Sequence, residues 1–248
     1  MFNTYLYTPL YNALIFLSDV IPGHSIGLAI IALTLIIKII LLPLYHQLWR
    51  TQQAMKAVEP ELKIIKEKYK ENREEQARQT MAIYKKYKIN PFSGIIIVFI
   101  QLPILLALFY VFKDSFNLHA DLLYSFVKAP EALNTNLFGI FDLTSRSYPL
   151  AILVGLTQFI QIKLSLPPQS PTLPKVTGAN NFGEDFKAMM GWQMRYIMPL
   201  FITFISLGLP GAITVYWITS NLFTIGHELI KKFYLTETPL NQKPLTSN

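Results

Sequence analysis

The stretch GLAIIALTLIIKIILLPLY, residues 27–45, decides the class of this protein. About 20 apolar residues are enough for a helix to cross a bilayer, and the apolar run around this stretch has that length. Lys38 lies inside the run. A charged side chain at the centre of a membrane costs about 2.5–3.5 kcal/mol on insertion scales and about 10–17 kcal/mol in simulations. Lys38 therefore either reaches the membrane interface or faces water inside the protein.

Both interpretations of Lys38 have support. Its stem could follow the helix toward Tyr45, roughly 10 Å away at ~1.5 Å per residue, and bring the ammonium to the interface. Pro43 and Thr34 favour the other interpretation. Pro43 loosens the helix about one turn after Lys38, and Thr34 extends the polar face one turn before it. Because polar faces within membranes usually line cavities, we expect Lys38 to face a hydrated space.

The composition indicates a membrane protein with several spans. The chain has 248 residues, of which 52% are hydrophobic and 15% are charged, and its mean hydropathy is +0.34. Such values are not those of an ordinary soluble domain. The absence of cysteine excludes disulfides, cysteine-ligated metals and a lipid-modified N-terminal cysteine. The net charge of +7 is compatible with contact to nucleic acid, anionic lipid or ribosome, and equally with the positive-inside rule.

Hydropathy and turn residues predict an all-α polytopic membrane protein with five transmembrane helices. We expect an N-terminal interfacial amphipathic helix at 1–22, spans at 23–45, 91–113, 148–166, 192–209 and 211–228, a cytoplasmic basic helical hairpin at 46–90, an extracytoplasmic loop at 114–147, a cytoplasmic loop at 167–191 and a cytoplasmic tail at 229–248. The alternative for residues 1–22 is a short additional span.

The distribution of basic residues predicts the orientation. Lys and Arg are concentrated in residues 46–90, where apolar residues also recur three or four apart, as in a pair of packed helices. Residues 114–147 instead balance a few basic residues with acidic ones. Since short loops rich in Lys and Arg stay in the cytoplasm, the N-terminus is predicted outside and the C-terminus inside a bacterial cytoplasmic membrane.

Common catalytic and metal motifs are missing. The sequence contains no HExxH, no GxxxxGK[ST] and no paired carboxylates within the apolar segments. The four histidines are scattered over interfaces and loops. An ion-coupled transporter would normally carry an acidic residue inside the membrane. We therefore predict no catalytic residue, no metal and no cofactor, and we do not expect an enzyme.

A set of polar residues remains inside the apolar segments. For each neutral member, a hydrogen bond between helices is the simpler explanation. Their spread over four of the predicted spans, together with one cation, favours a shared hydrophilic groove. The predicted groove residues are Lys38, Thr34, Gln101, Gln158, Gln161, Thr214, Trp217, Ser220 and Asn221.

Several motifs resemble the YidC/Oxa/Alb family of membrane protein insertases, in its bacterial YidC-like form. They are PLYNALIFL (9–17), TLIIKIILLPL (34–44), VEPELKIIKEKYK (58–70), NPFSGIIIVFIQLPILLALFY (90–110), MRYIMPLFITF (194–204) and YWITSNLFTI (216–225). The order of the predicted spans and the basic hairpin after the first span also fit this family.

The resemblance implies an insertase and chaperone that passes nascent transmembrane segments from the cytoplasm into the lipid bilayer without ATP hydrolysis. It implies a groove closed to the outside and open to the cytoplasm and lipid. Lys38 takes the place of a cation that is commonly arginine, and Trp217 matches a groove aromatic that could form a cation–π contact with it. Implied partners are nascent membrane proteins and the lipid bilayer, with the Sec translocon, ribosome and targeting receptor as candidates for the 46–90 hairpin and the tail. DNA is not expected as a partner.

Two other classes stay open at this point. A small channel or transporter could use Lys38 as a selectivity charge. A membrane-anchored assembly scaffold could bind partners through the 46–90 hairpin, with the spans serving only as anchors.

Overall fold

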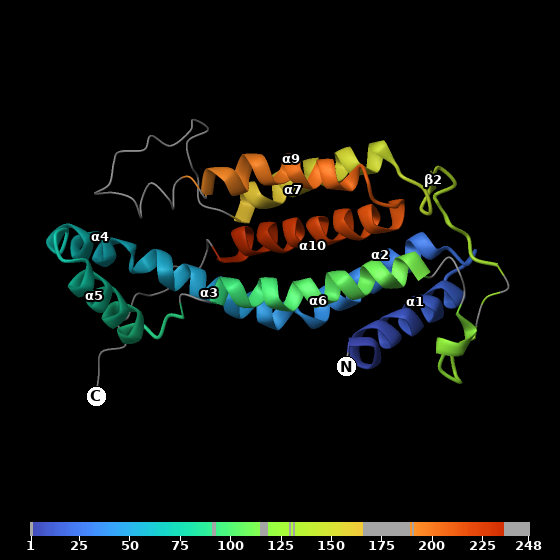
Figure 1. Cartoon of the computed structure of the whole chain (residues 1–248), viewed down its shortest axis with the longest axis horizontal. Coiled ribbons are helices and arrows are strands. Elements are labelled where there is room, and N and C mark those ends of the chain that lie inside the picture. Colours follow the sequence, from blue (N-terminus) through green and yellow to red (C-terminus); the bar gives the residue numbers. More distant parts are fainter. Residues whose placement is uncertain are drawn as a thin grey trace. The chain divides into compact units, whose positions relative to one another are not determined.

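The fold was analysed in a computed structural model of the chain, which describes residues 2–90, 93–114, 119–128, 130, 132–165, 189 and 191–235. Figure 1 shows the helices and strands coloured along the sequence. The chain divides into two compact units. Unit 1 comprises residues 1–10 and 37–111, and unit 2 comprises residues 11–36 and 112–248. Most of the predicted loop at 167–191 and of the predicted tail at 229–248 falls outside the described residues.

The described part of the chain is mostly helical, as the sequence predicts. The helices are η1 (Asn3–Tyr7), α1 (Thr8–Val20), α2 (Ile26–Ile40), α3 (Leu42–Ala57), α4 (Glu59–Lys68), α5 (Arg73–Lys86), α6 (Ser93–Asp114), η2 (Ala120–Leu122), α7 (Tyr148–Ser165), η4 (Gln193–Ile197), α9 (Met198–Ser206) and α10 (Gly211–Leu235). The division between the units falls within α1, α2 and α6.

In unit 1, α4 and α5 are two helices with clear sequence signals at their ends. Pro60 lies in the first turn of α4, where its missing N–H costs no hydrogen bond. Asn72 caps α5, because its side chain accepts a hydrogen bond from the Glu75 backbone N–H at 3.0 Å. The two helices are linked through Glu61 of α4, which forms an ion pair with Lys86 at 3.7 Å and accepts a hydrogen bond from the Tyr87 hydroxyl.

In unit 2, α7 packs against both α9 and α10. A small residue permits the close approach of α7 and α9: a β-carbon added to Gly155 would lie 1.9 Å from Thr203 Oγ1. Both helices carry buried apolar residues, among them Val154 of α7 and Val215 of α10. Tyr216 of α10 adds a ring contact with Phe112, with 6.1 Å between ring centroids.

A short antiparallel β-hairpin closes one end of unit 2, which is a small departure from an all-α chain. Its strands are β1 (Asn136–Leu137) and β2 (Phe141–Asp142). Leu137 and the following Leu143 are buried against the first turns of α2 and α10. Gly27 and Gly211 make this possible, since a β-carbon at either position would come within 3.0 Å of an atom of these leucines.

Hydrogen bonds also join the loop before α7 to α1. The Asn12 side chain donates to the carbonyl of Leu122 at 2.9 Å and accepts from the Tyr124 backbone N–H at 2.7 Å. The hydroxyl of Tyr11 accepts from the His119 backbone N–H at 2.9 Å. Tyr11 and Asn12 are both buried, so these bonds are shielded from solvent. Together with the β-hairpin, they give this end of unit 2 a fixed structure.

Among the described residues, α7 alone is by itself long and apolar enough to cross a membrane. The helices α2 and α3 satisfy the same test as a pair, with a bend of 51° between them. The bend falls at Leu41, just before Pro43, whose ring is incompatible with the carbonyl one turn earlier. The first predicted span, 23–45, thus corresponds to α2 and the start of α3.

Candidate functional site

Lys38 is buried near the end of α2, and its side chain is 6% exposed. Its Nζ donates a hydrogen bond to the hydroxyl of Tyr45 at 3.2 Å and lies 5.0 Å from the centre of the Tyr45 ring. The stem therefore runs toward Tyr45, the direction expected for a lysine that reaches for an interface, yet the residue remains shielded. Tyr45 holds the cation by a hydrogen bond and a ring contact.

Two of the predicted groove residues donate hydrogen bonds to backbone carbonyls of their own helices. Thr34 of α2 donates to the Ile30 carbonyl at 2.6 Å, and Thr214 of α10 donates to the Gly211 carbonyl at 2.7 Å. Both threonines are buried. A hydroxyl bonded to the preceding turn can still accept a hydrogen bond, but it does not need a partner from another helix.

A buried hydrogen bond joins α10 to α7. Asn221 Nδ2 donates to Thr157 Oγ1 at 3.1 Å. Thr157 in turn donates within α7 to the carbonyls of Leu153 and Val154, at 2.8 and 3.0 Å. The Thr157 hydroxyl therefore both accepts and donates a hydrogen bond. Asn221 and Thr157 form a buried polar contact between helices that are otherwise apolar.

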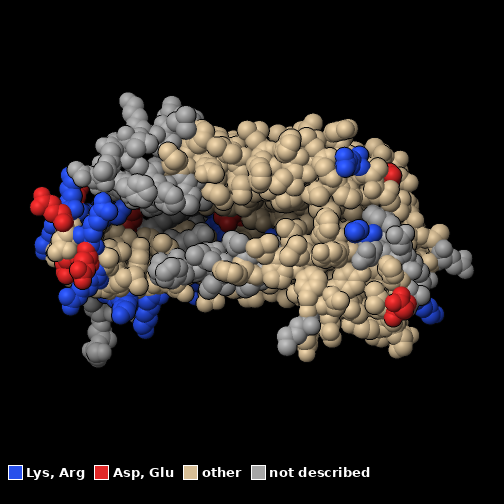
Figure 2. Space-filling model, in the orientation of Figure 1, with Lys and Arg blue, Asp and Glu red and all other residues tan. Residues whose placement is uncertain are grey.

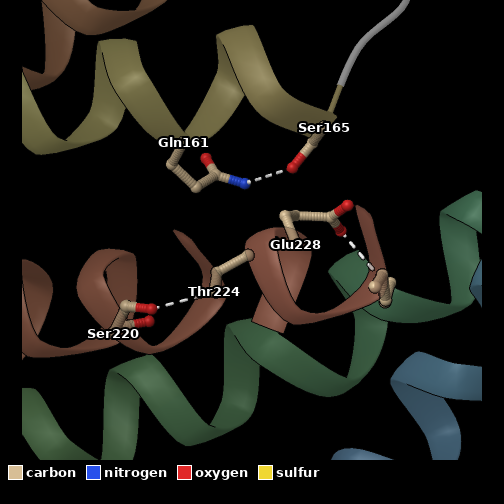
Figure 3. A network of polar contacts seen from close by, with 6 residues as sticks. Gln161, Ser165, Ser220, Thr224 and Glu228 are labelled. Atoms are coloured by element: carbon tan, nitrogen blue, oxygen red, sulfur yellow. Dashed lines mark hydrogen bonds and ion pairs between the residues drawn. The ribbon is translucent and has the colours of Figure 1, made fainter. Parts of the chain in front are cut away.

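Further along the same two helices, polar side chains face one another (Figure 3). On α7, Gln158 Nε2 donates to Gln161 Oε1 at 3.1 Å, and Gln161 Nε2 donates to Ser165 Oγ at 3.2 Å. On α10, the hydroxyl of Thr224 donates to the carbonyl of Ser220 at 2.9 Å. Gln161 and Ser165 point toward the α10 face that carries Thr224.

This α10 face ends in an ion pair. Glu228 Oε1 accepts a hydrogen bond from Lys231 Nζ at 2.9 Å, within one turn of the helix. The side chains are 20% and 9% exposed, respectively. We call the set Gln158, Gln161, Ser165, Thr224, Glu228 and Lys231 the α7–α10 polar cluster.

The predicted groove residues thus fall into separate environments. Asn221, Gln158 and Gln161 belong to contacts of α7 and α10, and Ser220 is buried beside them on α10. Trp217 is half-buried on α10 in unit 2, whereas the ring recorded against Lys38 belongs to Tyr45 in unit 1. The Gln101 side chain lies outside the described residues.

Five residues of these contacts were not among the predicted groove residues: Thr157, Ser165, Thr224, Glu228 and Lys231. For α10 the signal was present, because the spacing of three and four residues that relates Thr214, Trp217, Asn221 and Thr224 continues to Glu228 and Lys231. Thr157 lies four residues before Gln161 on the same face of α7. The sequence named Tyr45 only as the direction in which the Lys38 stem could run, and the structure shows that Tyr45 is a hydrogen-bond partner of Lys38.

In residues 2–90, 93–114, 119–128 and the other described ranges, no group of three or more His, Asp or Glu side chains could hold a metal ion. Two lysines of the contacts described above are buried, Lys38 in unit 1 and Lys231 in unit 2.

The surface around α7 and α9 is apolar. Exposed apolar side chains include Leu156 and Ile160 on α7 and Leu200, Phe201 and Phe204 on α9, and Phe204 is 74% exposed. Figure 2 shows almost no charged residues over the middle of these helices. Such a continuous apolar surface is unusual for a soluble protein and suits contact with lipid.

Charged residues gather instead over α4 and α5, where Lys and Arg lie among Glu residues (Figure 2). Part of this surface is neutralised internally, since Glu75 pairs with Arg78 at 3.8 Å and Glu61 with Lys86 at 3.7 Å. The pKa of the Lys86 ammonium is raised, first by its hydrogen bond with Tyr87 and then by the charge of Glu61, so this pair favours the charged form of Lys86.

These features define a helical membrane protein that keeps polar side chains within apolar helices. Comparison with known proteins agrees: residues 16–237 match the family described as 60Kd inner membrane protein. A Clostridium tetani protein named Membrane protein insertase YidC is 33% identical over 219 residues, which are 88% of this chain and 87% of that relative. A Francisella tularensis subsp. novicida protein of the same name is 32% identical over 231 residues, which are 89% of this chain and 36% of that relative.

The chain belongs to the 60Kd inner membrane protein family, which is the YidC/Oxa family. It is accordingly a bacterial inner-membrane protein, as the sequence predicts. It spans nearly the whole of the Clostridium relative but only about a third of the Francisella relative.

Proposed function

We propose that this chain is a membrane protein insertase, not an enzyme, that passes nascent transmembrane segments from the cytoplasm into the bilayer. The substrate would move through a hydrophilic groove that contains an intramembrane cation, without ATP hydrolysis. The observation that carries this proposal is the burial of Lys38, 6% exposed, within an apolar helix. The two relatives are named as membrane protein insertases, which supports the same activity.

The polar contacts of α7 and α10 support a hydrated path. Asn221, Gln158 and Gln161 place hydrogen-bonding groups inside helices whose other faces are apolar. The tightly packed β-hairpin with Leu137 and Leu143 supports closure of the opposite, extracytoplasmic end. In this proposal the path is open to the cytoplasm and to lipid.

We further propose the topology that the charge distribution predicts. Five spans would place the N-terminus outside and the C-terminus in the cytoplasm, with an interfacial helix before the first span. The α4–α5 pair would be the cytoplasmic hairpin that collects substrate or contacts the Sec translocon, the ribosome, the targeting receptor or anionic lipid. Its concentration of Lys and Arg supports a cytoplasmic location.

Hydrophobic partition can drive insertion without a nucleotide. Each Leu, Ile, Phe or Val contributes about −0.3 to −0.6 kcal/mol on the insertion scale, so some 20 of them give on the order of −10 kcal/mol. The polar tail of the substrate is the obstacle, because one Asp at the membrane centre costs about 2.5–3.5 kcal/mol. A hydrated groove lowers that barrier, and Lys38 would attract acidic tails.

Complementation of insertase-depleted bacteria tests the proposal. The chain and its variants Lys38→Arg and Lys38→Ala would be compared by protease protection of a small single-span substrate. Rescue by the chain and by Lys38→Arg, but not by Lys38→Ala, is expected. Rescue by all three would keep the insertase and remove the role of Lys38. Failure of the unaltered chain, despite correct membrane expression, would contradict the proposal.

The electrostatic role of Lys38 has a sharper test. Lys38→Glu should reverse the preference between paired substrates with acidic and basic tails.

Deletion of residues 50–88 distinguishes a scaffold, which would lose all activity, from an insertase, which would keep part of it. Ion conductance in liposomes would identify a channel.

A further inference from the structure

Glu228 is an unusual residue for its position. It is the one carboxylate in the sequence of α10, a helix that otherwise carries neutral and basic side chains. Its side chain is 20% exposed, so it has lost most of its hydration. A carboxylate in such a place is costly unless it is paired, and acidic residues within membrane segments usually mark a functional site.

The ion pair of Glu228 does not explain its presence by stability. Lys231 lies three residues later on the same helix, so the pair links no two elements of the fold. Pairs at this spacing stabilise an exposed helix by only about 0.2–0.5 kcal/mol. Replacing a shielded ion pair by apolar residues is often neutral or stabilising. The pair therefore keeps a carboxylate available and neutralised rather than holding the helices together.

The surroundings of Glu228 suit a ligand with several hydrogen-bond donors. Gln161 and Ser165 of α7 face the α10 surface on which Glu228 lies (Figure 3). Lys231 uses Oε1 of the carboxylate, and a carboxylate offers about four lone-pair positions. The hydroxyl of Ser165 accepts one hydrogen bond from Gln161 and has a second lone pair for another donor. An arginine or lysine side chain could thus reach the carboxylate and exchange with Lys231.

Under the proposed function, the substrate brings such a group to this end of α10. Transmembrane segments carry an excess of Lys and Arg on their cytoplasmic flank. The proposed topology places the end of α10 that holds Glu228 toward the cytoplasm. Lys38 would instead favour acidic tails, so the two residues would select substrate groups of opposite charge.

Resting on the proposed function, we infer that Glu228 is a binding subsite for the basic residue on the cytoplasmic flank of a substrate span. Lys231 occupies the carboxylate while the subsite is empty, and the substrate's arginine or lysine displaces it. The subsite retains the cytoplasmic flank while the rest of the segment moves into lipid.

The test measures preference within each variant, so that general effects on insertion cancel. Two single-span substrates would differ only in one flanking residue, Arg or Gln, and would be inserted into proteoliposomes containing the purified full chain. In the unaltered chain the Arg substrate should be inserted better. Glu228→Gln should reduce this preference about three- to tenfold, because a charged hydrogen bond is lost. Lys231→Gln should increase the preference, because it removes the competing cation.

Asp142→Asn is the control. Asp142 of β2 is also a hydrogen-bonded carboxylate, since it accepts from the Thr144 backbone N–H at 3.0 Å, and its loss should leave the preference unchanged. Since the chain has no cysteine, Ser165→Cys also provides a single site for bismaleimide cross-linking to a cysteine beside the substrate's flanking residue. Cross-linking should be stronger for the Arg substrate, and Glu228→Gln should abolish the difference.

Each result has one meaning. An unchanged preference and unchanged cross-linking in Glu228→Gln would overturn the subsite while normal insertion by the unaltered chain keeps the proposed function. If the Glu228→Gln protein does not fold, the Lys231→Gln variant is the test. An unchanged preference for the Arg substrate in Lys231→Gln would then overturn the inference. Absence of insertion by the unaltered chain would overturn both.

Discussion

Asn221 of α10 and Thr157 of α7 lie 64 residues apart in sequence, and their side chains are joined by a buried hydrogen bond of 3.1 Å. Thr157→Val leaves the buried Asn221 amide without its acceptor, and we expect it to destabilise the protein by about 1–3 kcal/mol, the usual cost of an orphaned polar group. Asn221→Leu should cost less, because the Thr157 hydroxyl still donates to the carbonyls of Leu153 and Val154. The coupling energy of the two substitutions should be about 0.6–1.7 kcal/mol, the range for such bonds between membrane helices.

A double-mutant cycle on detergent-solubilised protein, followed by denaturant unfolding, measures this coupling. Thr219→Val is the control, because the hydroxyl of Thr219 donates only to the Val215 carbonyl of its own helix. Coupling between Asn221 and Thr219 as large as that between Asn221 and Thr157 would contradict the role of the α7–α10 bond.

Gly155 sets the distance between α7 and α9. A β-carbon there would lie 1.9 Å from Thr203 Oγ1 and 3.2 Å from Thr203 Cβ. Gly155→Ala should therefore cost about 1–3 kcal/mol through overpacking. Thermal unfolding of the purified variant in detergent measures the loss, and adding Thr203→Ala should recover part of it.

Gly226 of α10 is the matched position for this prediction. A β-carbon there meets no atom within 4 Å, and Ala is up to about 1 kcal/mol better than Gly in a helix. Gly226→Ala should leave stability unchanged or raise it. If Gly155→Ala were equally harmless, the close contact between α7 and α9 would not be needed.

Tyr45 holds Lys38 in two ways, which can be separated by substitution. Tyr45→Phe removes the hydrogen bond of 3.2 Å and keeps the ring that lies 5.0 Å from Nζ, whereas Tyr45→Leu removes both. We expect Tyr45→Leu to reduce stability more than Tyr45→Phe, by about 0.5–2 kcal/mol, the range for a partly desolvated cation–π contact.

The same comparison in the Lys38→Met background isolates the contribution of the cation. There the difference between Tyr45→Phe and Tyr45→Leu should shrink. The exposed Tyr5 gives the control, since Tyr5→Phe should change the unfolding free energy by less than about 0.5 kcal/mol. A difference that persists without Lys38 would assign the effect to packing alone.

The stability of the end of the β-hairpin should depend on pH through Asp142. The Thr144 backbone N–H donates to Asp142 Oδ1 at 3.0 Å, and the Thr144 hydroxyl donates at 2.8 Å. These bonds lower the pKa of Asp142, with the backbone bond as the larger cause. Because the folded-state pKa is lowered, the stabilisation is present above the ordinary aspartate pKa and is lost as pH falls through the folded-state pKa.

Hydrogen exchange at the Thr144 amide reports this loss directly. Relative to the intrinsic rate, exchange should accelerate in acid, while the Ile140 amide, bonded to the Leu137 carbonyl, serves as an internal reference. Asp142→Asn keeps an acceptor but cannot ionise, so it should remove the acid dependence. An acid dependence that survives this substitution would assign it to another group.

Much of the fold could be predicted because each signal was local. Apolar runs, prolines and the Asn72 cap mark helices through interactions within one or two turns, and the helical membrane class follows from them. The family relationship is likewise a property of sequence and is confirmed. The number of spans and the sidedness of the loops remain predictions.

The candidate site was only partly predictable. Gln158, Gln161 and Asn221 stood out as polar residues in apolar segments. Asn221 donates to α7 from α10, whereas Gln158 and Gln161 form hydrogen bonds within α7. Thr34 was equally prominent, and its hydroxyl is also bonded within its own helix. A polar residue alone does not reveal whether its partner is its own backbone or another helix, because both satisfy the same hydrogen-bonding need.

The sequence by itself determined the membrane class, the family and the candidate polar residues, because hydropathy and helix periodicity depend on residue type and neighbouring positions. Tertiary structure decided which of those residues meet. It joined Thr157 to Asn221 and fixed the direction of the Lys38 side chain toward Tyr45. It also set Glu228 opposite the polar face of α7. Such pairings depend on how helices pack across long sequence separations, and no local signal specifies that packing.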